Sequence, residues 1–414
     1  MREMKDSGNV WYGKIPYAWE LNKIKYLTTI RSESAIYNPE EDKYIGLENV
    51  NGYSNNVVET DTEYDYSMQS ICKKDDILFS KLRPYLAKVF IAKHNSFCTG
   101  EFIVFSSFNG DRRYLFYSIL NPKFIENINS STYGAKMPRA NPQYIFDQQI
   151  CLPPLDEQQR IAEFLDRECG KIDGLKEDIQ AQIDTLEQYK RSVITEAVTH
   201  GLNPSAPMKD SGAGWMPLIP LHWKADKLKF HLRQRGIKNQ IDKQVLSLYR
   251  EYGIVPKDSR DDNHNVTSED VSDYRYVRVG DFVVNKMKAW QGSVAVSNYE
   301  GIVSPAYFVY EFSDDLINKR YSHYLMRNKT YATEFRRLSG GIREGQWDLP
   351  SEALNNTIIL LPPLDEQQEI ADYLDNKCAE IEQIIADKKS QIETLDGYKK
   401  SLIYEYVTGK KEVV

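Results

Sequence analysis

Basic and aromatic side chains recur together at two places in the chain, in stretches that are similar to each other. One stretch, DDILFSKLRPYLAKVF, begins at Asp75, and the other, GDFVVNKMKAWQGSVAV, begins at Gly280. The matching residues are Lys81 with Lys286, Arg83 with Lys288, and Tyr85 with Trp290. Ammonium and guanidinium groups neutralise phosphates, and aromatic rings stack on bases. We therefore expect both stretches to contact DNA; the alternative is that they are solvated surface charges beside a buried ring.

The distribution of charge supports this interpretation, although the whole chain has a formal net charge of −7. Residues 73–139 contain 11 basic and 5 acidic side chains, whereas residues 155–202 contain 6 basic and 11 acidic ones. Arg343 and Gln346 can each make bidentate hydrogen bonds to a base edge. The complete set of residues that we expect at DNA is Lys81, Arg83, Tyr85, Lys88, Lys136, Arg139, Lys286, Lys288, Trp290, Arg336, Arg337, Arg343 and Gln346.

No motif of catalysis or cofactor binding is present in the sequence. It has no GxxxxGK[ST] phosphate loop and no GxGxxG after a predicted strand, its six histidines are scattered, and its five cysteines lie far apart. The tetrapeptide NPQY at Asn141 resembles a loop of adenine methyltransferases, but Gln143 replaces its second proline, and a turn is the better interpretation. We expect a non-catalytic protein without a cofactor, metal ion or disulfide. Because no apolar run reaches about 18 residues, we also expect it to be cytoplasmic and not bound to a membrane.

The sequence contains an internal duplication. MKDSGNVWYGKIPYAWELNKIKYL from Met4 matches MKDSGAGWMPLIPLHWKADKLKFHL from Met208, and LPPLDEQQ occurs identically from Leu152 and from Leu361. A period of about half the chain is too long for a solenoid repeat. The segments between these borders are much less alike. The sequence therefore predicts a duplicated unit whose borders share one role while its middle has diverged.

Each middle segment has the pattern of a compact domain. The runs ILF and FVV, and later EFIVF and AYFVY, predict strands, and INKRYSHYLMRNKTYATEF predicts a helix. The predicted fold class is α/β (mixed α+β), with two globular domains in a pseudo-two-fold arrangement joined by two long helices that form an antiparallel coiled coil. We place the domains at 1–151 and 204–360, the helical arms at 152–203 and 361–409, and a tail at 410–414.

The two arms follow the LPPLDEQQ motifs. Apolar residues recur mostly at steps of three and four over residues 161–193 and 370–402. So long and narrow a stripe suits pairing of helices in a coiled coil, and a pseudo-two-fold axis would make the pairing antiparallel. Asp156 is the expected N-cap of the first arm. A glycine inside a helix costs about 1 kcal/mol, so the sequence leaves open a break near Gly170.

Together these features resemble the specificity subunit of type I restriction–modification systems, and the resemblance covers nearly the whole chain. It rests on the two LPPLDEQQ motifs with their arms, the two MKDSG segments, and the two basic stretches. It implies two target recognition domains, each reading one half of a split, asymmetric DNA site, with arms that set the spacing. It also implies two methyltransferase subunits that carry S-adenosylmethionine, and restriction subunits that use ATP and Mg²⁺.

The duplicated motif is the expected docking site for those partners. Capping a helix does not require a leucine and two glutamines twice over, so we expect the motif to start the arm and also to bind the methyltransferase. The expected partner-binding residues are Leu155, Asp156, Glu157, Gln158, Gln159, Leu364, Asp365, Glu366, Gln367 and Gln368. The alternative function is a coiled-coil interaction scaffold with two protein-binding domains, which would lack salt-dependent DNA retention.

Overall fold

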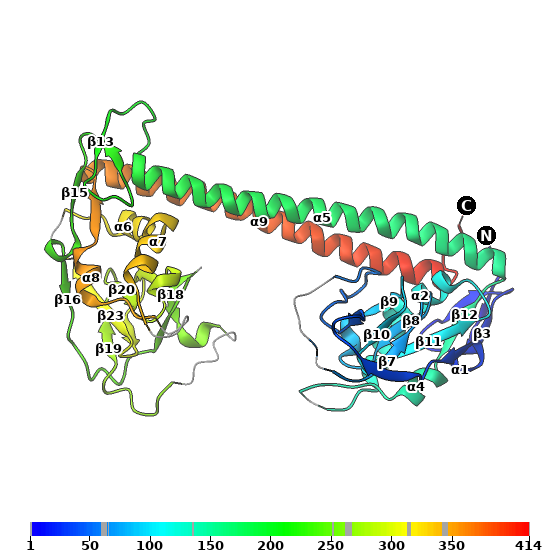
Figure 1. Cartoon of the computed structure of the whole chain (residues 1–414). Coiled ribbons are helices and arrows are strands. Elements are labelled where there is room, and N and C mark those ends of the chain that lie inside the picture. Colours follow the sequence, from blue (N-terminus) through cyan, green and yellow to red (C-terminus); the bar gives the residue numbers. More distant parts are fainter. Residues whose placement is uncertain are drawn as a thin grey trace. The chain divides into compact units, whose positions relative to one another are not determined.

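The computed structural model describes residues 2–58, 64, 66–134, 136–250, 252–260, 267–312, 316–341 and 347–413. They form two compact units (Figure 1). Unit 1 comprises residues 1–180 and 388–414, and unit 2 comprises residues 181–387. Each unit therefore contains one globular domain and one end of each long helix, so the division falls within the two arms expected from the sequence.

Unit 1 contains two four-stranded sheets. Their strand orders are β4-β11-β8-β9 and β5-β7-β10-β6, and two-stranded ladders join β1 to β2 and β3 to β12. The strands are β1 (Met4–Asp6), β2 (Lys14–Pro16), β3 (Glu20–Lys23), β4 (Thr28–Ile30), β5 (Ser34–Tyr37), β6 (Tyr44–Ile45), β7 (Ser67–Cys72), β8 (Ile77–Ser80), β9 (Val89–Ile91), β10 (Ser96–Cys98), β11 (Phe102–Phe108) and β12 (Gln149–Leu152). The helices are α1 (Ile24–Leu27), η1 (Pro84–Leu86), α2 (Arg112–Leu120), α3 (Pro122–Ser130), α4 (Pro142–Asp147) and the start of α5 (Leu155–His200).

The strands β8 and β11 are buried on both faces, which explains their continuous apolar runs. Ile77 and Phe79 point into the core shared with α2 and α3, whereas Leu78, between them, belongs to a second cluster on the opposite face. The strand predictions for ILF and EFIVF are thus confirmed, as are those for FVV and AYFVY in unit 2.

Unit 2 repeats this order of elements. Its main sheet, β16-β23-β20-β21, corresponds to β4-β11-β8-β9, and two-stranded ladders join β13 to β14, β15 to β24, β17 to β18 and β19 to β22. The strands are β13 (Met208–Asp210), β14 (Leu218–Pro220), β15 (Lys224–Lys227), β16 (Leu232–Gln234), β17 (Leu246–Tyr249), β18 (Gly253–Pro256), β19 (Arg275–Val277), β20 (Phe282–Asn285), β21 (Val294–Val296), β22 (Gly301–Val303), β23 (Tyr307–Phe312) and β24 (Ile358–Leu361). The helices are η2 (Leu228–Phe230), η3 (Lys257–Ser259), η4 (Ala289–Gln291), α6 (Lys319–Arg327), α7 (Lys329–Leu338), α8 (Ser351–Asn356) and the start of α9 (Leu364–Val407).

The single helix predicted over residues 317–335 is wrong in one respect, because the structure divides it into α6 and α7. Asn328 between them has extended backbone angles, and its side chain accepts hydrogen bonds from the N–H groups of Thr330 and Tyr331. A side chain that caps a new helix in this way ends the preceding one. The apolar spacing is preserved across the break and could not reveal it.

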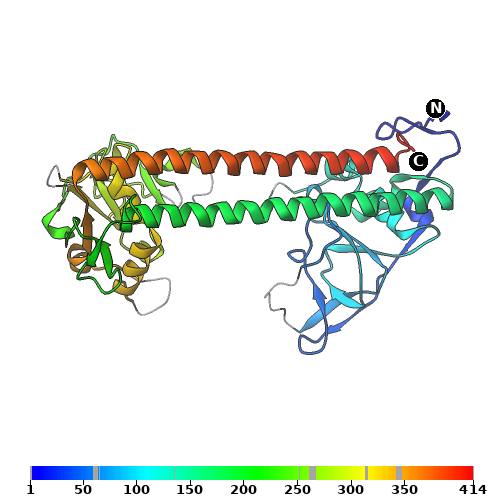
Figure 2. The same ribbon diagram turned by 90° about the horizontal axis from the view of Figure 1, so that it is seen from above.

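In each unit the two long helices lie antiparallel (Figures 1 and 2). In unit 1 the rings of Phe164 and Tyr406 are 4.3 Å apart, and Lys399 Nζ donates to both carboxylate oxygens of Asp173 at 2.7 Å. In unit 2 the end of α5 and the start of α9 share one hydrophobic core. The mixed α/β fold with long antiparallel helices is therefore confirmed. No helix in the described part of the chain is long and apolar enough to cross a membrane.

Two details of the first arm differ from what the sequence suggests. The helix α5 is unbroken at Gly170, where the neighbouring residues Cys169 and Ile172 pack into the core of unit 1 and hold the helical turn in place. The helix also begins at Leu155, so Asp156 lies inside its first turn and is not the N-cap. The backbone carbonyl of Pro154 accepts the N–H groups of Glu157 and Gln158, and the helix starts two residues earlier than an N-cap at Asp156 would place it.

Candidate nucleic-acid interface

The first part of the site in unit 1 is the basic loop, residues 81–88, which follows β8. The backbone of Arg83 is left-handed, with φ of 48°, and this turns the chain sharply into η1. Lys81 Nζ donates to the carbonyl of Gly100 at 2.7 Å, and Lys88 Nζ donates to that of Leu47 at 2.6 Å. These bonds hold the two ammonium groups in place, and a backbone carbonyl, unlike a carboxylate, does not neutralise them. Tyr85 is 49% exposed.

The structure adds a second segment, which we call the closing loop; in unit 1 its described residues are 133–134 and 136–139. The N–H of Arg83 donates to the carbonyl of Pro138 at 2.8 Å, and the N–H of Ala140 donates to that of Lys81 at 2.9 Å. The expected residues Lys136 and Arg139 are thereby brought beside the basic loop, and both are exposed. Arg139 is also paired with Glu101 at 2.6 Å, which lowers the local positive charge.

Unit 2 joins the equivalent segments in the same way. Its basic loop is residues 286–292, and the N–H of Leu349 donates to the carbonyl of Lys286 at 2.9 Å. The rings of Trp290 and Trp347 are 5.5 Å apart, and Trp290 Nε1 donates to the carbonyl of Met287 at 3.1 Å. The described parts of the closing loop of unit 2 are residues 340–341 and 347–349.

The remaining expected residues of unit 2 differ in exposure and in ion pairing. Lys288 is exposed, and Lys286 Nζ lies 3.6 Å from Asp348. Arg336 and Arg337 are exposed on α7, which packs against η4, but Arg337 is bonded to Glu334 at 2.7 Å. Arg343 and Gln346 lie outside the described residues.

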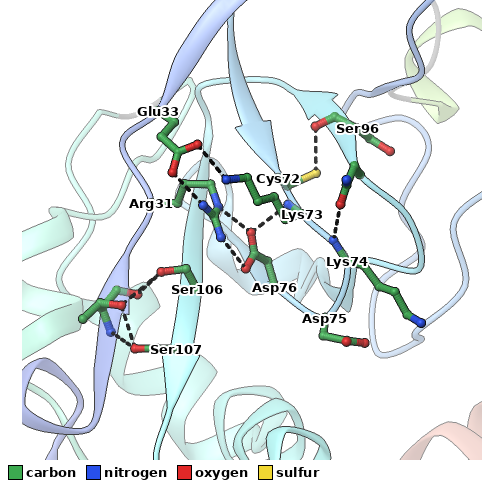
Figure 3. Close-up of polar contacts among 12 residues, drawn as sticks. Arg31, Glu33, Cys72, Lys73, Lys74, Asp75, Asp76, Ser96, Ser106 and Ser107 are labelled. Carbon is green, nitrogen blue, oxygen red and sulfur yellow. Dashed lines mark hydrogen bonds and ion pairs between the residues drawn. The ribbon is translucent and has the colours of Figure 1, made fainter.

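The sequence did not indicate two buried ion pairs, one at the start of each strand that leads into a basic loop. In unit 1 Arg31 donates to both oxygens of Asp76, from Nε at 2.7 Å and from Nη2 at 3.2 Å, and Asp76 also accepts the N–H of Lys73 (Figure 3). Hydrogen bonds with Asp76 raise the pKa of the Arg31 guanidinium. The same guanidinium and the Lys73 ammonium hold the pKa of the exposed Glu33 below its usual range, Lys73 having the larger effect.

In unit 2 the matching pair is Arg235 and Asp281. Arg235 donates to both Asp281 oxygens, at 2.7 and 2.9 Å, and Asp281 accepts the N–H of Arg278 at 2.8 Å. Each aspartate immediately precedes the strand that leads into a basic loop, β8 or β20. The repeat places Asp76 on Asp281, and this correspondence was the one signal in the sequence that could have revealed the pair.

Some residues of the LPPLDEQQ motif are buried against the domain, and others are exposed to solvent. Gln158 is buried; its Nε2 donates to the carbonyl of Pro153, and its Oε1 accepts the N–H of Asp111, the N-cap of α2. Gln367 does the same in unit 2, accepting the N–H of Asn318, the N-cap of α6. The recurrence of this glutamine in both motifs thus has a structural cause, because it fastens the arm to the domain.

The other expected docking residues also separate by exposure. Glu157 and Glu366 are partly buried and bonded within their own units. The exposed members of the expected docking set are Leu155, Asp156, Gln159, Leu364, Asp365 and Gln368. Docking of a partner by the ten expected residues of the two motifs remains a prediction.

Asn141 of the NPQY sequence caps α4, its side chain accepting the N–H of Gln143 at 2.9 Å, so this motif is a local turn into a helix. All five cysteines are buried and free. Among the residues that the structure describes, no group of three histidine, cysteine or acidic side chains is placed to hold a metal ion.

Comparison with known proteins agrees with this geometry. Residues 19–185 and 237–394 match the family described as type I restriction modification DNA specificity domain. The specificity subunit of the type I restriction enzyme MjaVIII of Methanocaldococcus jannaschii is 25% identical over 73% of this chain and 71% of its own length. The EcoKI specificity subunit of Escherichia coli K12 is 21% identical over 96% of this chain and 90% of its own.

A solved structure from work on complex assembly and conformational transition of the type I R-M system has the same fold, with a TM-score of 0.67 and 15% identity. The similarity covers 96% of this chain and 99% of that chain. The family match extends over most of the sequence and includes both domains and both arms. The chain therefore belongs to the family of type I restriction modification DNA specificity domains.

Proposed function

We propose that each unit reads one half of a split, asymmetric DNA site through its basic loop and its closing loop. The chain is then the sequence-specific DNA-binding subunit of a type I restriction–modification complex and is not itself an enzyme. The observation that carries the proposal is the joining of two distant segments in each unit, which gathers exposed cations and aromatic rings at one place. Cations give affinity through phosphates, and side chains that reach base edges give sequence selectivity.

The differences between the units support two different half-sites. Unit 1 presents Tyr85 and Tyr133, which are 49% and 63% exposed, whereas unit 2 presents the Trp290–Trp347 pair. Different rings and cations on the same scaffold present different groups to a groove, and so select different bases.

The proposed partners are two methyltransferase subunits, which carry S-adenosylmethionine, and restriction subunits, which use ATP. The exposed first turns of α5 and α9, with Leu155 and Leu364 at 54% and 48% exposure, are suitable docking surfaces. The long helices would then act as a spacer that sets the number of unread base pairs.

Methylome sequencing of the host with and without this gene tests the proposed function. We expect a bipartite, adenine-methylated motif to disappear when the gene is removed. Retention of purified chain on DNA, weakening steeply as salt rises, would separate DNA recognition from a protein scaffold. An unchanged methylome together with no retention at low salt would contradict the proposal.

A further inference from the structure

The first turn of α5 holds an arginine from elsewhere in unit 1. Arg2 Nη2 lies 2.6 Å from one carboxylate oxygen of Glu157 and 2.8 Å from the other. The Arg2 guanidinium also lies over the Trp19 ring, 5.0 Å from its centre, and Trp19 Nε1 donates to Glu157 at 2.9 Å. A carboxylate and an indole thus form a seat for one guanidinium. Arg2 Nη2 is bonded to the carboxylate and the cation lies over the ring, while Nη1 has no hydrogen-bond partner among the described residues.

Unit 2 contains the same seat without the arginine. The matching residues are Glu366 for Glu157, Trp223 for Trp19, and Ala206 for Arg2. Beside these residues unit 2 has a pocket of about 310 Å³, lined by Ala206 and Glu366 among others. Trp223 is fully buried and is not one of the residues that line it.

Trp223 shows that the seat in unit 2 is incomplete. Its side chain is fully buried, yet no described residue accepts a hydrogen bond from its Nε1. The carboxylate that would accept it, Glu366, is instead bonded to the half-exposed His222 at 2.7 Å. A buried donor without an acceptor is unfavourable unless water or a ligand supplies the acceptor.

The charge around the pocket also differs from that in unit 1. Arg160 pairs with Asp156 at 3.3 Å in unit 1, but Glu369 takes the place of Arg160 in unit 2. Among the described residues, the pocket is lined by Asp365, Glu366 and Glu369, and by no lysine or arginine. The two arginines that balance the acidic turn in unit 1 are therefore both replaced in its counterpart.

We propose that this pocket binds a guanidinium group, supplied by an arginine side chain of a partner protein that docks on the first turn of α9. Arg2 in unit 1 shows, within the same chain, which group the seat accepts. A protein source is favoured because the pocket includes Asp365 of the exposed motif turn, next to Leu364, which is 48% exposed. The inference gives the chemistry of the docking surface and so rests on the proposed docking role.

The pocket can be tested without the partner. The full chain, labelled with ¹⁵N at tryptophan, is titrated with N-acetyl-L-arginine methylamide, and the indole signal of Trp223 is assigned from Trp223→Phe. We expect a saturable shift of that signal, and weaker binding of the lysine analogue, because only a guanidinium makes the planar two-point contact. Glu366→Gln should weaken binding about tenfold or more, as expected for loss of a charge-assisted hydrogen bond.

A substitution that copies unit 1 gives the sharpest variant. Ala206→Arg should fill the seat as Arg2 does and abolish binding of the probe. Ser205→Arg, which adds the same charge one residue away at an exposed position, is the matched control and should keep binding. Arg2→Ala should create a second site, reported by the Trp19 indole. Circular dichroism of each variant checks that the fold is retained.

The source of the arginine is tested by assembly with the methyltransferase subunit of the same system. Ala206→Arg should weaken assembly about tenfold or more relative to Ser205→Arg. No saturable Trp223 shift in the wild type, or equal probe binding by Ala206→Arg and wild type, overturns the pocket. Probe binding with unchanged assembly of Ala206→Arg overturns the partner source. If the wild type does not assemble at all, the proposed docking role fails, and the titration alone decides whether the pocket is a guanidinium site.

Discussion

Two aspartates, Asp76 and Asp281, lie at the start of the strands that lead into the basic loops. Each accepts hydrogen bonds from an arginine guanidinium and from a backbone N–H. The side chain of Asp76 is 2% exposed. A buried carboxylate that holds a buried guanidinium is costly to remove, since the remaining charge has no equivalent partner. These pairs fix the start of the strands that lead into the basic loops.

Replacing Asp76 with Asn should therefore destabilise unit 1. The amide keeps the shape but loses the charge that faces Arg31, and we expect a loss of about 2–3 kcal/mol in the free energy of unfolding. Thermal and urea unfolding of the variant would measure it. Glu33→Gln, which alters the exposed partner of the same arginine, should change stability much less, because water screens that ion pair. Equal effects of the two substitutions would show that the buried pair has no special role.

The cations of the basic loop lead to a prediction about binding. Lys286→Ala with Lys288→Ala should weaken DNA binding and lower the slope of log K against log salt by about one unit for each lost phosphate contact. Binding measured at several salt concentrations gives the slope directly. Lys389→Ala, on the exposed surface of α9, is the control and should leave the slope unchanged. If the double variant keeps the wild-type slope, these two lysines do not contact phosphates.

At the scale of elements, the strands and long helices could be predicted because their signals are local. Apolar runs such as ILF predict buried strands, and the apolar stripe of each arm predicts a helix of about the observed length. The closing loop could not be predicted, because it joins Arg83 to Pro138, residues that are far apart along the chain. The break at Asn328 was missed because capping acts on one residue and leaves the apolar spacing intact.

The same limit applied to the site. The repeat identified the basic loops, since their residues recur at matching positions, but it could not show that Gln158 points inward, toward the N-cap of α2. That orientation depends on where Asp111 lies in space, and no pattern within the motif contains it. For Arg343 and Gln346, which lie outside the described residues, base contact stays a prediction.

The arms lead to a prediction about spacing. Deleting Ile179–Thr185 and Lys388–Thr394 removes one heptad from each helix and leaves the Lys176–Asp396 and Lys190–Glu382 pairs in the chain. A heptad is about 10 Å of helix at ~1.5 Å per residue, or about three base pairs at roughly 3.4 Å each. The methylated motif should keep both half-sites and have a shorter gap.

Bending of the DNA can make the observed change smaller than about three base pairs. The matched control deletes two residues from each arm, which shifts the apolar seam to another face of the helix and should disrupt pairing. An active heptad-deleted protein that keeps the original gap would exclude the arms as a ruler.

At the scale of the whole molecule, the duplicated architecture predicts that the two readers act independently. Exchanging residues 30–150 for the equivalent segment of a relative should change one half of the recognised motif and leave the other half intact. Methylome sequencing of cells that carry the exchange gives the result. A change in both halves would mean that base selection is shared between the units.

The composition of unit 1 has a consequence for biosynthesis. Its core includes Leu402, Ile403 and Val407, which leave the ribosome long after its globular domain has been made. All of unit 2, residues 181–387, is synthesised before the last segment of unit 1, residues 388–414. At ~5–20 residues per second, the nascent N-terminal domain waits on the order of 10–50 s for its final helix. During that interval the apolar face of the domain that later packs against α9 is exposed to chaperones and to premature association. A chain whose translation stops early lacks this helix, and the core of its N-terminal domain stays incomplete.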